Sequence, residues 1–279
     1  MLLLLTAQTG FSQKAPILKT VGPEKGSLLI IGGGKVGPEI WSKFIELAGG
    51  ESANIIVIPT AGDDSTINRG VSKEKEILES LGVRTVSVLH TRDPKIAETE
   101  QFAAPIKKAT GIWFVGGRQW KIADALLNTR THRELNNLLS RGGVIAGTSA
   151  GATIQGSFLL RGDTKGNEIL VGDHLQGLDF IHNVAIDQHI LKRNRQFDLI
   201  EVIRSKPELL GIGIDESTAI FVQKDTFEVL GTSYAAVYDS SQLNTARPFV
   251  FLSRGQKYDL KNRKVIAEVP KSANPISNK

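Results

Sequence analysis

A serine flanked by glycines is the clearest chemical signal in the sequence. Residues 147–152 read GTSAGA and directly follow the apolar run Gly143 to Ala146. This is the GxSxG pattern of a nucleophile elbow, a tight strand-to-helix turn that holds a serine above the end of a sheet. Glycines flank the serine because such a turn leaves no room for larger side chains. A glycine-rich turn with an incidental serine is the alternative, but the strand before it and the helix-like segment after it favour Ser149 as a nucleophile.

A nucleophilic serine needs a base, and the sequence offers five histidines, namely His90, His132, His174, His182 and His189. His189 ends the stretch AIDQH, where an apolar strand gives way to polar residues. Its imidazole is therefore expected to project from a strand end, as the serine does. A histidine hydrogen-bonded to nearby backbone is the alternative, and His132, in a helical stretch, is predicted to lie at the surface. We predict that His189 is the general base.

A third group must orient the imidazole, and the segment 211–219, GIGIDESTA, supplies two acids directly after an apolar strand. A carboxylate in this position holds the correct histidine tautomer and stabilises the imidazolium. Because adjacent residues of a strand point to opposite faces, only one of Asp215 and Glu216 can readily face His189. The residues themselves leave that choice open.

Two further glycine clusters follow predicted strands. Residues 32–37, GGGKVG, fit the GxGxxG fingerprint of dinucleotide sites, but the acid expected after the next strand is replaced by Pro59 and Thr60. Dinucleotide binding is therefore not predicted. The second cluster contains Gly116 and Gly117, whose bare backbone could approach a substrate closely. We predict that the N–H groups of Gly117 and Ala150 form an oxyanion hole.

Composition limits the chemistry further. The chain has 279 residues, of which 41% are hydrophobic, enough for one main domain with a substantial core. Its formal charge of +5 comes from lysines and arginines scattered among 29 acidic residues, and only 6% of residues are aromatic, so nucleic-acid binding is not predicted. The absence of cysteine excludes disulfides, thiolate ligands and a cysteine nucleophile. Neither a metal nor an organic cofactor is predicted.

The elements that must position these residues follow from the hydrophobic pattern. Apolar runs alternate with amphipathic stretches, which predicts an α/β fold with a three-layer, doubly wound, mostly parallel sheet that binds ligands beyond the carboxyl ends of its strands. The predicted strands are Ser27 to Ile31, Asn54 to Ile58, Thr85 to Leu89, Gly111 to Val115 and Gly143 to Ala146. The predicted helices are Pro38 to Leu47, Ser72 to Leu81, Trp120 to Leu127 and His132 to Leu139. After about residue 165, extra C-terminal β strands are predicted at Ala185 to Asp187, Gly211 to Ile214, Thr218 to Gln223 and Phe227 to Leu230, with a helix from about Arg193 to Arg204.

The two ends of the chain differ from the middle. The apolar run Leu2 to Leu5, followed by small and polar residues, predicts a leader over residues 1–14 and export to the periplasm or medium, with mature protein beginning near Lys14. A hydrolase domain is expected over 15–239, then a hairpin and polar tail over 240–279. No later segment approaches the roughly 20 apolar residues that span a bilayer. The mature protein is therefore expected to be soluble.

Several motifs in fixed order resemble the cyanophycinase family, whose relatives include aspartyl dipeptidases. The likeness spans residues 28–239 and includes both glycine clusters, GTSAGA at 147, DQH at 187, GIGIDESTA at 211 and GTSYAAVYD at 231. The resemblance implies a class I glutamine-amidotransferase-like fold, possible homodimers, and Ser149, His189 and Glu216 as catalytic residues. The order Ser, His, Glu also separates the chain from α/β-hydrolases, where the acid precedes the histidine.

The resemblance also implies a substrate class. It points to a serine exopeptidase or dipeptidase that cleaves small β-aspartyl peptides or a cyanophycin-like polymer. The residues expected to line the substrate site are Arg118, Gln119, Asp187, Gln188, Arg193 and Arg195. Cyanophycinases proper carry an acid in place of Arg118 and an arginine in place of Asp198, so a preference for neutral or acidic partners over arginine is expected. A non-catalytic binding protein of the same fold and an esterase are the alternatives.

Overall fold

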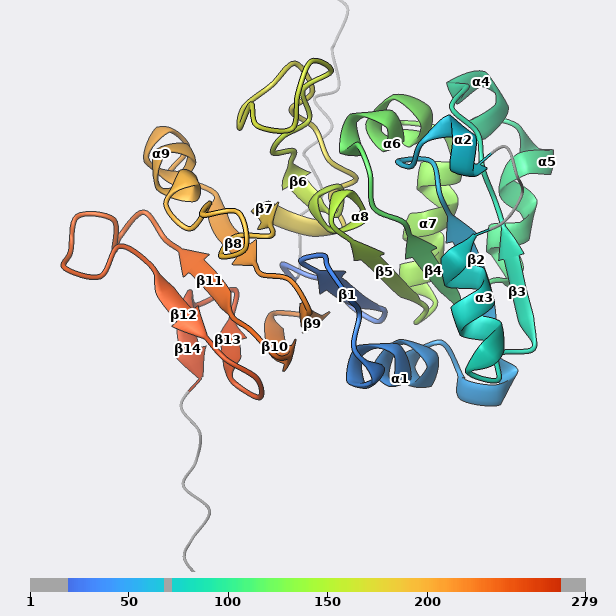
Figure 1. The fold of residues 1–279 in the computed structure, drawn as a ribbon, viewed down its shortest axis with the longest axis horizontal. Coiled ribbons are helices and arrows are strands. Elements are labelled where there is room, and N and C mark those ends of the chain that lie inside the picture. Colours follow the sequence, from blue (N-terminus) through green and yellow to red (C-terminus); the bar gives the residue numbers. More distant parts are fainter. Residues whose placement is uncertain (1–19, 68–71, 267–279) are drawn as a thin grey trace, which may run out of the picture.

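The computed structural model describes residues 20–67 and 72–266. The predicted leader and the end of the predicted polar tail lie outside these residues. Two β-sheets and the helices packed on them make up the described chain (Figure 1). None of the helices in these two ranges has the length and apolar character that crossing a membrane requires.

The larger sheet has nine strands in the order β14-β13-β10-β9-β1-β5-β4-β2-β3. Its parallel half contains β1 (Ser27–Ile31), β5 (Val144–Thr148), β4 (Gly111–Phe114), β2 (Asn54–Ile58) and β3 (Thr85–Val88). Its antiparallel half contains β9 (Thr218–Gln223), β10 (Thr226–Gly231), β13 (Lys257–Asp259) and β14 (Lys264–Ile266). The predicted mostly parallel sheet with extra C-terminal strands is confirmed.

A second sheet of five strands accompanies the first, in the order β12-β11-β8-β7-β6. Its members are β12 (Val250–Leu252), β11 (Ala235–Tyr238), β8 (Leu210–Ile214), β7 (Ile181–Gln188) and β6 (Gly156–Phe158). β7 runs parallel to β8, so the ends of these two strands lie side by side. The sequence pattern predicted extra strands here but did not separate them into another sheet.

Helices cover both faces of the parallel strands. They are α1 (Pro38–Leu47), α2 (Asp64–Ile67), α3 (Lys73–Ser80), α4 (Pro94–Ala97), α5 (Glu100–Ala103), α6 (Gln119–Leu126), α7 (Arg130–Ser140), α8 (Ala150–Thr153) and α9 (Asp198–Ser205), with 3-10 helices at Gly50–Ser52 and Ala104–Lys108. Alternate residues of β1 point to opposite faces of the sheet. Leu28 and Ile30 pack with α6 and α7 in the core on one face, while Leu29 packs with α1 and α3 in the core on the other. This is why the parallel strands read as continuous apolar runs.

The helix expected from about Arg193 begins instead at Asp198. Residues 189–197 form turns, because the Asp215 carboxylate accepts hydrogen bonds from the backbone N–H groups of Leu191 and Lys192, each at 3.0 Å. Figure 1 shows α9 and the second sheet on the left of the view and the parallel strands on the right. The junction between them holds the candidate site.

Candidate active site

Ser149 stands at the turn between β5 and α8 with φ 54° and ψ −111°, a backbone conformation that a residue with a side chain rarely adopts. A Cβ atom on Gly147 would lie less than 3.0 Å from the carbonyl oxygen of Gly151. A Cβ on Gly151 would likewise lie less than 3.0 Å from the carbonyl oxygen of Phe114. Glycine is therefore required on both sides of the serine, and the turn has the geometry of a nucleophile elbow.

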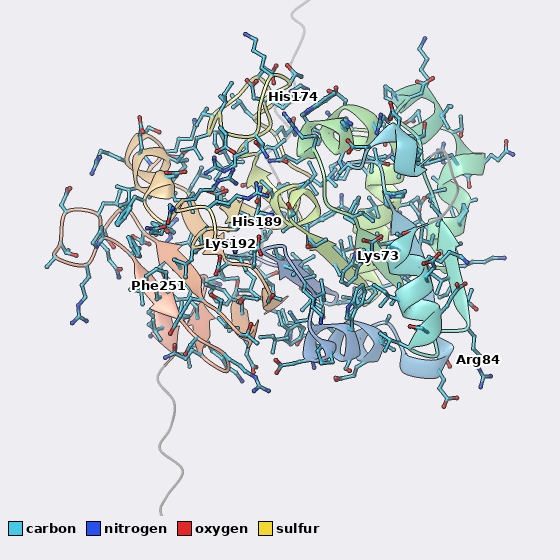
Figure 2. The ribbon with its side chains drawn as sticks, viewed as in Figure 1. Lys73, Arg84, His174, His189, Lys192 and Phe251 are labelled. Carbon is cyan, nitrogen blue, oxygen red and sulfur yellow. The ribbon has the colours of Figure 1, made fainter. Side chains whose placement is uncertain are left out.

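His189 joins the serine to a carboxylate. Its Nε2 lies 3.0 Å from Ser149 Oγ, and its Nδ1 lies 2.6 Å from Glu216 Oε1. Serine and histidine come from different sheets, because Ser149 follows β5 and His189 follows β7. Figure 2 shows His189 near the middle of the molecule, at this junction. The order of contacts is that of a nucleophile, a base and a group that orients the base.

The choice between the two adjacent acids is settled by their contacts. Glu216 faces His189, whereas Asp215 accepts from Ser233 Oγ at 2.7 Å and from two backbone N–H groups of the turn after His189. Burial opposes ionisation of Asp215, but these hydrogen bonds hold the pKa of its carboxyl below the ordinary value. Asp215 thus shapes the loop that carries the imidazole, and its neighbour contacts the imidazole itself.

The first glycine cluster makes room for this pair. A Cβ on Gly33, where φ is 117°, would enter the imidazole of His189, and one on Gly34 would lie 2.7 Å from Glu216 Oε2. The backbone N–H of His189 also donates to Gly32 O at 3.0 Å. The sequence showed these glycines as a dinucleotide-like motif and as part of the family resemblance, but did not predict their contact with the base. Three consecutive glycines after a strand were the available signal.

The predicted oxyanion donors are Ala150, which directly follows the serine, and Gly117, which follows a glycine in contact with the serine. Gly116 packs against Ser149, since a Cβ there would be 3.3 Å from the serine Cβ. Arg118 N–H donates to Ala61 O at 2.8 Å and fixes the turn that contains Gly117. Within residues 20–67 and 72–266, the N–H of Gly117 donates to no protein acceptor. Ala150 is the first residue of α8, so its N–H has no acceptor within the helix.

The imidazole of His189 is only slightly exposed, and this affects its charge. Burial lowers the pKa of His189 below the ordinary 6.5, the hydrogen bond to Glu216 raises it, and the positive charges of Arg193 and Arg195 lower it further. The net direction is downward. Near neutral pH the ring is therefore uncharged and able to accept a proton from Ser149.

Two residues expected to line the substrate site are buried and engaged elsewhere. Gln119 is 1% exposed and donates through Nε2 to Leu160 O at 2.8 Å. Asp187 is 0% exposed, and its two oxygens accept from Arg161 at 2.8 Å each. Both expectations of direct substrate contact are thus replaced by supporting roles, because these side chains point into the protein and are used there.

Arg161 is a residue that sequence reasoning missed. Its guanidinium pairs with Asp187 through two parallel hydrogen bonds and with Asp198 at 2.6 Å. It thereby links the segment after β6 to the end of β7 and the start of α9. The only sequence signal was a charged residue after an apolar pair, and nothing local connects it to an aspartate 26 positions away.

The remaining predicted substrate residues come from two turns, with Arg118 after β4 and Gln188, Arg193 and Arg195 at and after the end of β7. Arg118 is half-buried and donates through Nη2 to Asp163 O at 2.7 Å, while its buried Nε has no partner in the described part of the chain. Gln188 is almost fully buried, with Oε1 3.5 Å from Arg195 Nη1. Arg193 is exposed. Of the three arginines, Arg118 and Arg193 have side chains at least partly exposed, whereas Arg195 is buried and pairs with Glu168.

Two other predictions concern the position of His132 and metal binding. His132, predicted at the surface, is half-buried, and its Nε2 lies 2.9 Å from Leu178 O because α7 packs against the segment before β7. Among the residues that the structure describes, no three His, Cys, Asp or Glu side chains are grouped to hold a metal ion.

Comparison with known proteins identifies the family. The model of peptidase family S51 matches residues 28–230. A cyanophycinase of Geminocystis herdmanii is 36% identical over 230 residues, covering 79% of this chain and 83% of that protein. A cyanophycinase of Trichormus variabilis is 33% identical over 276 residues, covering 90% of this chain and 91% of that protein.

Solved structures share the fold. A peptidase from an acI-B1 Actinobacterium superposes with a TM-score of 0.63 at 24% identity, covering 85% of this chain and 98% of the other. A putative peptidase E from Listeria monocytogenes gives a TM-score of 0.53 at 21% identity, covering 75% of this chain and all of the other. The expected class I glutamine-amidotransferase-like fold is confirmed. The family match over most of the described residues, together with relatives above 30% identity, shows that the chain belongs to peptidase family S51.

Proposed function

We propose that this peptidase is a serine hydrolase that cleaves amide bonds through an acyl-enzyme. The observation that carries the proposal is the hydrogen-bonded series Ser149, His189 and Glu216, with contacts of 3.0 and 2.6 Å. A serine beside a neutral, oriented imidazole can be activated as a nucleophile at physiological pH. The strained turn at Ser149 and the two backbone N–H groups beside it supply the other parts that this chemistry needs.

In this mechanism His189 Nε2 accepts the hydroxyl proton as Ser149 Oγ attacks the substrate carbonyl carbon. The oxyanion accepts hydrogen bonds from the N–H groups of Gly117 and Ala150. His189 then gives the proton to the leaving amine, and an ester to Ser149 remains. A water molecule, deprotonated by His189, then attacks the ester carbonyl in the same way. The bond to Ser149 breaks, Ser149 Oγ regains its proton from His189, and the carboxylic acid product is released. Glu216 holds Nδ1–H and stabilises the imidazolium at each step.

The substrates we propose are β-aspartyl peptides, cleaved from the chain end, or a cyanophycin-like polymer. Two observations support this class. The relatives with 36% and 33% identity are cyanophycinases. Arg193 and Arg195 lie in the turn segment after the base and are close enough to lower its pKa, and guanidinium groups bind carboxylates through paired hydrogen bonds.

A comparison of the wild-type protein with the Ser149→Ala variant tests the reaction. We expect the wild type to hydrolyse β-aspartyl-leucine and the variant to lose several orders of magnitude in kcat while keeping its thermal midpoint. Ser157→Ala serves as the matched control, because Ser157 belongs to β6 of the second sheet and, among the described residues, its hydroxyl bonds only to the backbone of Val184. Equal turnover in wild type and a folded Ser149→Ala protein contradicts the mechanism. Binding without turnover by the wild type indicates the non-catalytic alternative, and turnover of esters alone indicates the esterase.

Arg118 is expected to make the enzyme prefer neutral β-aspartyl peptides over those that carry arginine. It adjoins the oxyanion donor Gly117, and a cationic group on the substrate would meet its charge in a partly buried site. We expect kcat/KM for β-aspartyl-leucine to exceed that for β-aspartyl-arginine by about tenfold or more, which corresponds to about 1.4 kcal/mol. Arg118→Asp should reverse the order, and Arg118→Lys should keep it. A wild-type preference for β-aspartyl-arginine would contradict this role.

A further inference from the structure

The segment between β6 and β7, residues 159–180, is held to its surroundings by several contacts. Figure 1 shows it as the yellow loops near the top of the view, above α8. Gln119 and Arg118 hold its beginning through Leu160 O and Asp163 O. His174, labelled at the top of Figure 2, holds its later part through Asp124 at 2.7 Å. Glu168 lies between these attachments.

Glu168 pairs with a buried arginine. Arg195 is 3% exposed, and its Nη2 donates to Glu168 Oε1 at 2.9 Å. Its other contacts are weaker, since Nη1 lies 3.5 Å from Gln188 Oε1 and the buried Nε has no hydrogen-bond partner within residues 20–67 and 72–266. Among the described residues, Glu168 is the one carboxylate that forms an ion pair with Arg195. The Glu168 side chain is itself 77% exposed.

The neighbouring Arg161 has a different kind of partner. Both oxygens of the fully buried Asp187 hold it, and Asp198 on α9 adds a third contact. These acids belong to a sheet strand and a helix, so Arg161 is neutralised by the body of the protein. Arg195 depends on an exposed side chain from a loop. A buried guanidinium requires a countercharge, but a ligand carboxylate can supply it as well as a protein one.

Arg195 is also close to the proposed reacting groups. Gln188, its weak partner, directly precedes the base His189. The charge of Arg195 is near enough to act on the imidazole. A substrate carboxylate bound to Arg195 would thus lie beside the proposed catalytic residues, in the place that Glu168 Oε1 now occupies.

We propose that Glu168 is an internal competitor for Arg195, which a carboxylate of the substrate displaces on binding. The inference rests on the proposed function and deepens it, because it selects peptides with a free carboxylate close to the scissile bond. It predicts that the apparent affinity of the protein for the substrate falls as Glu168 occupies the Arg195 guanidinium for a larger fraction of the time. Exposed carboxylates in ion pairs add little to the stability of a protein. The proposal therefore gives the exposed carboxylate of Glu168 a role in ligand binding.

The test compares wild type, Glu168→Gln and Glu51→Gln. Glu51→Gln is the matched control, because it removes the same charge from an exposed ion pair, that of Glu51 with Arg84. Figure 2 shows Arg84 at the far lower right of the molecule. Calorimetric titration with L-aspartate and hydrolysis of β-aspartyl-leucine are measured on the full chain. We expect Glu168→Gln to lower the aspartate Kd and the substrate KM by about 3- to 10-fold with kcat unchanged. Glu51→Gln should match wild type.

A change of KM and Kd in the opposite direction would also be informative. If Glu168 merely holds Arg195 in place, Glu168→Gln raises KM and Kd, and that result or no change overturns the inference. In a double-mutant comparison, the gain from Glu168→Gln should vanish in the Arg195→Gln background. Failure of hydrolysis in wild type rejects the proposed function, whereas unchanged aspartate binding in Glu168→Gln with normal hydrolysis rejects only the competitor.

Discussion

Three residues that surround the proposed reaction have left-handed backbone conformations. The φ angles are 54° at Ser149, 54° at His189 and 56° at Ser217, which follows Glu216. Each such conformation in a residue with a side chain costs on the order of 1–3 kcal/mol and persists only where the surrounding structure enforces it. Ser149 and His189 follow strands β5 and β7 and contact each other, and Ser217 directly follows Glu216, which contacts His189. The strain is therefore used to bring the three proposed catalytic side chains to one place.

The charge next to His189 gives a prediction for pH. Because burial and the two arginines lower the pKa of the imidazole, the base stays neutral and activity persists below the ordinary 6.5. Activity is lost as pH falls through the lowered pKa. Arg193→Gln removes one cation, so the pKa rises and the acid limb of kcat/KM should move to higher pH. Arg193→Lys keeps the charge and should keep the limb. An unmoved limb in Arg193→Gln would show that the exposed charge is screened.

At the scale of elements, the site depends on one loop. The turn after β1 contacts the base through Gly33 and the carboxylate through Gly34, and a carbonyl of the same turn accepts from the base's backbone. The strand before it was predicted with the same bounds that the structure has, Ser27–Ile31. The role of the glycines could not be predicted, because their partners lie more than 150 residues away in the sequence and in another sheet.

A pair of glycine variants tests this loop. Gly33→Ala places a methyl group within the imidazole of His189 in a backbone conformation that alanine resists, so the ring must move. Displacement of a catalytic group by about 1 Å costs on the order of 10²-fold in rate, and we expect a loss of kcat/KM of at least that size. Gly37→Ala is the control, since a Cβ there meets no atom of the described residues within 4 Å. Thermal midpoints separate displacement from unfolding, and near-normal activity in Gly33→Ala would contradict the packing.

At the scale of the whole molecule, local patterns predicted elements but not their partners. The bounds of α1, β2 and β9 match the predicted ones because each is a short apolar or amphipathic run with clear ends. Assignment of β7 and β8 to a second sheet depends on pairing between distant segments, which periodicity does not encode. Asp187 likewise looked like a ligand-binding residue beside the base. Its burial and its bond to Arg161 depend on tertiary packing alone.

The central claim is that the junction of the two sheets activates Ser149. Labelling with a fluorophosphonate probe, followed by mass spectrometry of the intact protein and its peptides, tests this most directly, because an ordinary serine does not react. We predict a single adduct on Ser149 in wild type, and its loss in His189→Ala with the fold retained. Labelling should weaken in Glu216→Gln, since the imidazole is then less well oriented. Absence of the adduct in folded wild-type protein, or equal labelling after the base is removed, would contradict the account.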